Sequence, residues 1–219
     1  MIRFSDVKQS EKIRTYIQRA DETLAVQGFT DHGFGHVTKV STEAADILRT
    51  MGYPEREAEL AQIAGYLHDI GNVVNRTAHA QTGAVLAFRL LEELDAAPEE
   101  IATIITAIGN HDEGTSVPVS PICAAVILAD KSDVREGRVR NRDVQTFDIH
   151  DRVNHAVKQS ALTISEDRTE INLDLTIDTA YCAVMDYFEI FLTRMSLCRR
   201  AAEMLKLRFT LTINGQQLL

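Results

Sequence analysis

The hydrophobic pattern changes its period once along the chain, and this change constrains the fold more than any other feature. Up to about Asp133 apolar residues recur at intervals of three and four, as they do on one face of an α-helix. Such stripes occupy residues 13–24, 37–51, 60–67, 85–94, 101–108 and 120–130. The pattern predicts a bundle of about six helices in this part of the chain.

Beyond about residue 145 apolar residues alternate with polar ones instead. Leu162 and Ile164, and then residues 171–177, alternate on either side of the polar stretch 166–169, which is typical of a β-hairpin. A long helix is expected at 179–205, and residues 209–213 alternate again before a turn at Asn214-Gly215. We therefore predict an α+β fold that is mainly α.

This reading divides the chain into a helical part at 1–145 and a small α+β appendage with an antiparallel hairpin at 146–219. The appendage either packs on the helices or forms the contact of a homodimer.

Charge and composition exclude several classes of protein. The formal net charge of −9 argues against general affinity for nucleic acid. The longest apolar run, residues 122–129, is far shorter than the roughly 20 residues of a membrane span. The first residues contain no apolar signal segment, and three cysteines without a Cys-x-x-Cys pair suit a reducing compartment. A cytoplasmic protein without a membrane partner is expected.

The histidines carry the clearest functional signal. His68 and Asp69 follow one another at the end of an apolar helix, and Asp130 closes another apolar helix in the same way. Burying such groups is costly unless they are paired or bind a metal ion. Imidazoles and carboxylates on the ends of different helices can form a metal centre in the core of a bundle.

Each of these residues also has an ordinary structural explanation when taken alone. A single histidine on an amphipathic helix is more often a satisfied polar residue than a ligand, and this holds for His150 and His155. Asp31 can be a helix N-cap. The polar segment 135–148 is either a linker or a loop that faces a substrate. The order of the residues together, rather than any one of them, favours a metal centre.

That order resembles the HD-domain metal-dependent phosphohydrolases. The defining His, His-Asp and Asp of this superfamily correspond to His36, His68-Asp69 and Asp130. The surroundings are similar too, at Tyr66-Leu-His-Asp-Ile-Gly71, His79 with Gly83-Ala84, Asn110-His-Asp-Glu113 and Ala129-Asp-Lys131. The resemblance extends from about His32 to Asp133.

The resemblance implies a ligand set for two divalent transition metal ions, which would be Mn, Fe, Ni or Zn. His36, His68, Asp69 and Asp130 would hold the first ion, while His79 and His111 would hold the second with Asp69 as the bridge. Ions of this kind lower the pKa of a water molecule toward neutrality. No other cofactor is expected.

The catalytic residues implied in this way are Asp69, His68 and Lys131. Lys131 or one of four arginines can neutralise a substrate phosphate; these are Arg135, Arg138, Arg140 and Arg142. His32, four residues before His36, is a candidate ligand or substrate contact.

The function implied is hydrolysis of a phosphomonoester or phosphodiester of a small molecule such as a nucleotide. Asn72 stands where the cyclic-dinucleotide branch has a lysine, and Gly114-Thr115-Ser116 replaces its Gly-Tyr-Pro, so a cyclic dinucleotide is not expected. Two alternatives remain open. One is a di-iron oxygenase on the same ligands, which would consume O2, and the other is a nucleotide sensor that binds without turnover.

Overall fold

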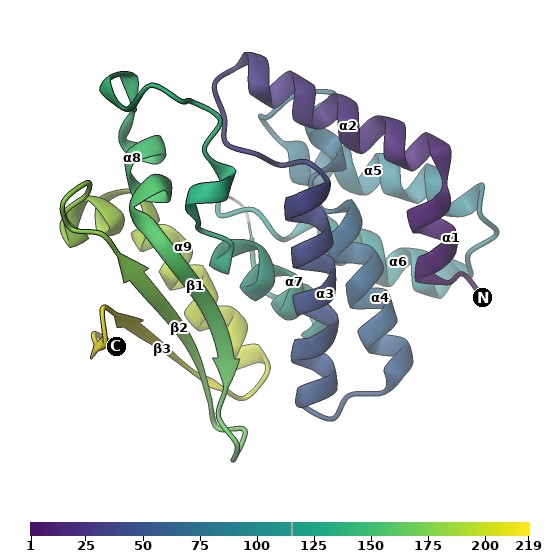
Figure 1. Ribbon diagram of the computed structural model, residues 1–219. Coiled ribbons are helices and arrows are strands. Elements are labelled where there is room, and N and C mark those ends of the chain that lie inside the picture. The colour runs from purple at the N-terminus through teal and green to yellow at the C-terminus, as the bar shows by residue number, and fades with distance from the viewer. Residues whose placement is uncertain (115) are drawn as a thin grey trace.

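A helical bundle carries a smaller layer of sheet and helix along one side in the computed structural model, which describes residues 1–114 and 116–219 (Figure 1). The α-helices of the bundle are α1 (Phe4–Gln9), α2 (Glu11–Val26), α3 (Phe34–Thr50), α4 (Glu55–Leu67), α5 (His79–Glu92), α6 (Pro98–Gly109) and α7 (Pro121–Ser132). The elements that follow are α8 (Ile149–Ala156), β1 (Val157–Ile164), β2 (Glu170–Ile177), α9 (Val184–Met204), β3 (Arg208–Ile213) and β4 (Gln216–Gln217). Short 3-10 helices are η1 (Ile70–Val73), η2 (Glu136–Arg138) and η3 (Val144–Thr146). Thr115, in the segment discussed above, lies outside the described residues.

The mainly helical α+β fold is confirmed, and the six predicted helices correspond to α2 through α7. Helix α1 was not predicted, because it has six residues and buries Val7 alone, which is too little for a periodic pattern. Val85 was assigned to an apolar face but is 69% exposed. The predicted helix at 179–205 begins later, at Val184.

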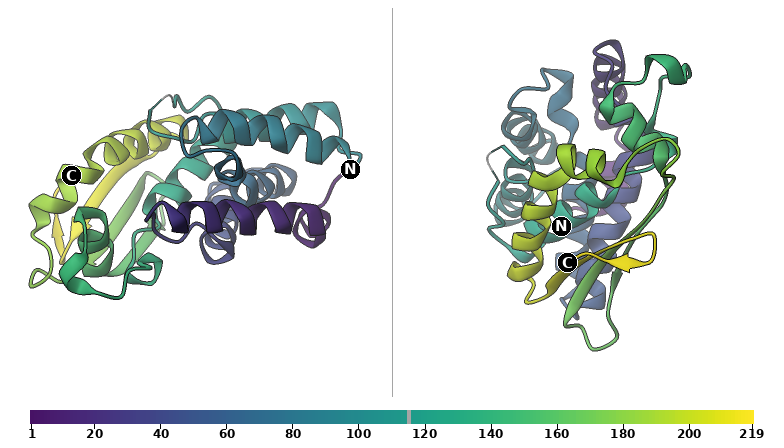
Figure 2. Two further views of the ribbon diagram at one scale, coloured as in Figure 1. Left: turned by 90° about the horizontal axis from the view of Figure 1, so that it is seen from above. Right: turned by 90° about the vertical axis from the view of Figure 1, so that its left-hand side faces the viewer.

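Helix α7 is the central element of the molecule. All of its residues from Ile122 to Ser132 are buried. It contacts α3, α4 and α6 on one side and α9 and β1 on the other. Seen from above, it lies between the bundle and the C-terminal layer (Figure 2). A helix that is apolar all round is stable in such a position, since each of its faces has a partner.

The sheet has the strand order β1-β2-β3-β4. The predicted hairpin is confirmed, with β1 and β2 antiparallel and Ile164 opposite Ile171. Strand β3 pairs with β2 in parallel, which the alternating pattern did not predict, and α9 connects the two strands. Helix α9 contacts both β3 and α7, so it covers the sheet and joins it to the bundle. The division of the chain at residue 145 stays a prediction.

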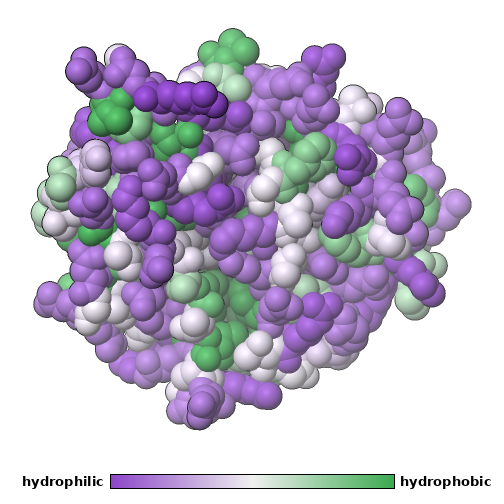
Figure 3. All heavy atoms as spheres, viewed as in Figure 1, coloured by the Kyte–Doolittle hydropathy of each residue, from purple (hydrophilic) through white to green (hydrophobic). Residues whose placement is uncertain are grey.

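The face of the molecule in Figure 3 is mostly hydrophilic, with its apolar side chains in small separate groups. Among the described residues, no helix combines the length and the apolar character needed to cross a bilayer.

Candidate metal centre

The six predicted ligands, which are far apart in the sequence, lie together in the core of the bundle. His36 lies in the first turn of α3, and His68 and Asp69 follow the end of α4. His79 begins α5, His111 follows the end of α6, and Asp130 lies near the end of α7. All six side chains are buried, Asp130 being the most exposed at 9%. The ends of five helices therefore meet at one point.

One group of ligand atoms consists of His36, His68 and Asp130. The Nε2 atoms of His36 and His68 are 3.3 Å apart. Asp130 Oδ1 lies 3.3 Å from His36 Nε2 and 3.6 Å from His68 Nε2. Asp69 Oδ2 completes the group, at 3.6 Å and 3.3 Å from the same two nitrogens. Four donor atoms thus surround one point, as around a single metal ion.

A second group lies on the other side of Asp69. His79 Nε2 and His111 Nε2 are 3.2 Å apart. Asp69 Oδ1 is 3.3 Å from His79 Nε2 and 4.0 Å from His111 Nε2. Asp69 therefore directs one carboxylate oxygen to each group, which is the arrangement of a carboxylate that bridges two ions.

The hydrogen bonds at Nδ1 of the four imidazoles turn their Nε2 atoms toward the centre, where Arg76 Nη1 also lies 3.5 Å from His79 Nε2. Three rings donate from Nδ1 to a backbone carbonyl oxygen: His68 to that of Gly65 at 2.8 Å, His79 to that of Arg76 at 3.1 Å, and His111 to that of Ile108 at 2.6 Å. A carbonyl can only accept, so each Nδ1 carries the hydrogen and each Nε2 has a lone pair. Metal-bound histidines are oriented in this way.

The crowding of lone pairs and carboxylates fits a bound cation. Burial alone would lower the pKa of His68, but the carboxylates of Asp69 and Asp130 raise it to about 10. The same site therefore favours a positive charge at the Nε2 atoms. A proton can supply this charge to one nitrogen, whereas a metal ion can supply it to several ligands at once.

Asp133 belongs to the site although it was not predicted. Its Oδ2 atom accepts a hydrogen bond from His36 Nδ1 at 2.8 Å, and its Oδ1 accepts from Arg135 Nε at 2.8 Å. Burial opposes ionisation, but His36 and Arg138 hold the pKa of Asp133 well below its usual range. Asp133 thereby orients His36 as an outer carboxylate orients a metal-bound histidine. Its position one helical turn after Asp130 is the available sequence signal.

Lys131, predicted to be catalytic, is held in an ion-pair chain. Its ammonium lies 2.7 Å from Asp130 Oδ2 and 3.2 Å from Glu113 Oε2, and Arg194 Nε of α9 lies 2.6 Å from Glu113 Oε1. Burial would raise the pKa of Glu113, but Lys131 and Arg194 lower it to about 2. Lys131 thus fixes the carboxylate of Asp130. Neither Glu113 nor Arg194 had been singled out as a candidate residue in the sequence.

The remaining candidate residues have different positions. His32 donates from Nδ1 to the Thr30 carbonyl at 2.7 Å and lines a small cavity at the centre. Arg138 is buried and lines the same cavity. Arg140 pairs with Asp21 instead, and Arg142 is exposed.

The close approach of η1 to α5 brings Asp69 and His79 together, and it depends on a glycine. A Cβ atom added to Gly71 would lie 2.0 Å from the His79 carbonyl oxygen and 2.5 Å from the Gly83 nitrogen. Both neighbours are backbone, so they cannot move aside without displacing α5. The close approach of Gly71 to Gly83 is thus part of the site.

We expect Gly71→Ala to lower the free energy of unfolding by at least about 1–3 kcal/mol, the usual cost of an overpacked core. It should also reduce metal binding at His79 and His111. Thermal unfolding and metal analysis would measure both effects. Gly109→Ala is a matched control, since its Cβ would meet Ala84 at an ordinary 3.6 Å. Equal stability and equal metal content of the two variants would contradict this account.

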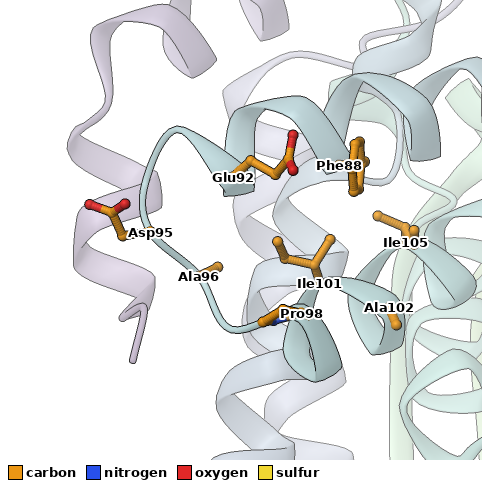
Figure 4. Close-up of a pocket in the computed structure, with 8 residues that line it drawn as sticks. All are labelled: Phe88, Glu92, Asp95, Ala96, Pro98, Ile101, Ala102 and Ile105. Atoms are coloured by element: carbon orange, nitrogen blue, oxygen red, sulfur yellow. The ribbon is translucent and has the colours of Figure 1, made fainter.

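A larger hollow elsewhere has no part in this centre. It has a volume of about 410 Å³ and is lined mainly by apolar side chains between α5 and α6, among them Phe88 and Ile101 (Figure 4). Phe88 is nine residues after His79, and Ile101 is ten residues before His111, which places them about 14 Å and about 15 Å along the chain from these histidines at 1.5 Å per helical residue. None of the predicted ligands lines it.

Comparison with known proteins agrees with the geometry. A family model described as HD domain matches residues 33–154, which is more than half of the chain and includes all six predicted ligands. The chain belongs to the HD-domain family. HD domains bind divalent metal ions and are generally metal-dependent hydrolases, and the buried His and Asp groups of this HD domain could hold such ions.

The HD-domain chain is also similar to an uncharacterised protein of Methanocaldococcus jannaschii, MJ1020. The two are 25% identical over 171 residues, which cover 67% of this chain and 65% of that protein. The chain thus spans less than two thirds of the length of this relative.

Proposed function

We propose that the protein is a metal-dependent phosphohydrolase with a two-metal centre, acting on a phosphoester of a small molecule such as a nucleotide. The observation that carries this proposal is the carboxylate of Asp69. Its two oxygens face two separate groups of imidazole nitrogens, 3.3 Å from His68 Nε2 on one side and 3.3 Å from His79 Nε2 on the other.

The donor set suits borderline transition metals. His36, His68, Asp69 and Asp130 would hold one ion, and His79, His111 and Asp69 would hold the other. When bound, divalent ions supply a water molecule of lowered pKa and offset the charge of a phosphoryl group. Three protein ligands at the second ion leave positions for water and substrate.

The other residues of the site orient and bind. Asp133 holds the ring of His36, and Lys131 holds Asp130. The guanidinium of Arg76 lies 3.7 Å from Asp69 Oδ1, where it can contact a phosphoryl oxygen. His32 has its Nδ1 hydrogen bonded to Thr30, and burial followed by the charge of Arg138 lowers its pKa well below the usual range. The ring is therefore neutral, and its Nε2 lone pair can accept a hydrogen bond from a water molecule or a substrate.

The test is metal analysis of protein purified without oxygen, followed by phosphate release from a panel of phosphoesters. The panel should include nucleoside monophosphates, p-nitrophenyl phosphate and bis(p-nitrophenyl) phosphate, with Mn, Fe, Ni or Zn added back separately to chelated protein. We expect hydrolysis that depends on the added metal and is absent after chelation.

Two results would contradict the proposal. Consumption of O2 by the iron-loaded protein, with cleavage of a carbon–phosphorus or carbon–carbon bond, would indicate an oxygenase. Tight nucleotide binding without turnover with any of the four metals would indicate a sensor.

A further inference from the structure

A cleft of about 360 Å³ opens beside the metal centre. It shares part of its wall with the small cavity over the predicted ligands, namely His32, Arg76, Arg138 and Arg194. A molecule in the cleft therefore lies next to the centre. Ligand sites of small proteins typically have about 300–1,000 Å³, so the cleft has room for an organic group the size of a nucleoside.

The shared wall carries three arginines, and each also faces a carboxylate: Arg76 that of Asp69, Arg138 that of Asp133, and Arg194 that of Glu113. Its three arginines come from separate segments, with Arg76 after η1, Arg138 in η2 and Arg194 in α9. Arg138 is 4% exposed and donates to the neutral backbone carbonyls of Asp31 and Asp133 at 2.9 Å and 2.8 Å. A buried guanidinium is costly unless anions compensate it, and Asp133, 3.9 Å from Arg138 Nε, is shared with His36 and Arg135. The position of the arginines favours an anionic ligand at the junction of cleft and cavity.

The three arginines differ in how directly they contact the predicted metal ligands. Arg76 is next to Asp69 and can contact a phosphoryl group at the centre itself. The contacts of Arg194 reach Asp130 only through Glu113 and Lys131. Arg138 is likewise separated from the ligands, by Asp133, whose Oδ2 is 3.9 Å from its Nε atom. Arg138 and Arg194 are thus placed for a second anionic group beyond the first.

The rest of the cleft suits an organic group with an aromatic ring and polar substituents. Phe29 and Phe191 line it, and each ring is covered on one side by an arginine, at 5.6 Å from Arg76 and 4.6 Å from Arg194. Asp151 and Asn154 of α8 add oxygen atoms that accept hydrogen bonds. Aromatic rings and acceptors together match the base and the hydroxyl groups of a nucleoside.

Resting on the proposed function of a two-metal phosphohydrolase, we propose that the substrate carries two linked phosphoryl groups on an organic group of nucleoside size, as in a nucleoside diphosphate, so that the bond hydrolysed is a phosphoanhydride rather than a phosphoester. The terminal phosphoryl group lies at the metal centre beside Arg76, the inner one contacts Arg138 and Arg194, and the nucleoside lies in the cleft. The oxygen of water bonds to the terminal phosphorus, and the bond from this phosphorus to the bridging oxygen breaks. That oxygen leaves on the nucleoside monophosphate, inorganic phosphate is released, and the remaining proton passes to solvent.

The test measures binding as well as hydrolysis. Calorimetry would give dissociation constants of AMP and of adenosine 5′-(α,β-methylene)diphosphate, with and without metal. Initial rates would be measured on ADP, AMP and p-nitrophenyl phosphate. The variants are Arg194→Gln, Arg194→Lys and, as a matched control on the exposed face of the same helix, Arg200→Gln. Circular dichroism would check that each variant folds.

We expect the wild type to bind the diphosphate at least about tenfold more tightly than AMP, since one charge-assisted contact is worth about 1.5–3 kcal/mol. Arg194→Gln should weaken binding of the diphosphate about tenfold and binding of AMP clearly less, so that the preference for the diphosphate falls, while Arg194→Lys keeps part of that preference. Arg200→Gln should match the wild type.

Two outcomes would overturn this inference. One is a wild type without preference for the diphosphate, and the other is an Arg194→Gln variant that loses affinity equally for the diphosphate and for AMP. Failure of the proposed function would look different, because no ester, including p-nitrophenyl phosphate, would be hydrolysed with any metal while the diphosphate preference in binding persisted.

Discussion

Replacing Asp69 with alanine is expected to abolish hydrolysis and to remove metal from both halves of the centre. Asp69 directs Oδ2 toward His36 and His68 and Oδ1 toward His79. No other carboxylate in the described part of the chain has oxygens within 3.6 Å of the Nε2 atoms of both groups. The loss in kcat/KM should exceed the roughly 10- to 100-fold that outer-shell partners of a metal site cost.

The measurements are metal content per chain and phosphate release over the panel of esters. Asp69→Asn keeps the shape of the side chain and removes the charge, so it separates loss of metal from loss of packing. Asp46→Ala is the control for the loss of a carboxylate away from the centre, because Asp46 lies on the exposed surface of α3, where it pairs with Arg49. A correctly folded Asp69→Ala protein with full metal content and full turnover would contradict the assignment of the whole centre.

The fold was predictable wherever burial follows a regular period. The apolar stripes of α2 through α6 and the alternation in β1 and β2 are local, because each of these elements buries one face against the core, whereas α7 is buried on every face. The parallel pairing of β2 and β3 was not predictable in this way, since alternation shows that a strand is half-buried but not which strand lies beside it. The start of α9 at Val184 was also missed.

The ligands of the site were predictable for a different reason. His36, His68-Asp69 and Asp130 stand in a family order, and this order holds although the residues are far apart in the chain. Asp133 and Arg194 stand outside that order, and their roles depend on distances that only the folded chain shows. Arg194 lies beyond the residues that match the family model, on a helix whose sequence predicted nothing about the centre.

Helix α9 links the C-terminal region, predicted to be an appendage, to the candidate site. Because α9 packs on α7 and carries Arg194 to Glu113, it contributes to the wall of the cleft as well as to the core. The residues that select the substrate and the predicted metal ligands can therefore lie in different parts of the chain.

The number of metal ions can be tested at the second group of ligands. We expect the wild type to bind about two ions per chain, as two-metal hydrolase sites do, and His79→Ala or His111→Ala to bind about one. Burial lowers the pKa of both histidines, that of His111 well below its usual range, so both rings are neutral and free to bind metal near neutral pH. Their Nδ1 hydrogens are held by backbone carbonyls, which leaves Nε2 for the ion.

The first ion should remain in both variants, because its four ligands His36, His68, Asp69 and Asp130 are unchanged. Each of the two Nε2 atoms in this group lies within 3.6 Å of an oxygen of both carboxylates. Metal analysis after extensive dialysis gives the count, and thermal unfolding shows whether the fold is intact. His155→Ala, in α8 and not among the residues that line the cleft or the central cavity, is the matched control for the loss of an imidazole. If the wild type saturates at one ion, and both variants still hold that ion and react at the normal rate, the second group is not a metal site. Hydrolysis would then depend on the first group alone, and His79 and His111 would serve only to pack and orient Asp69.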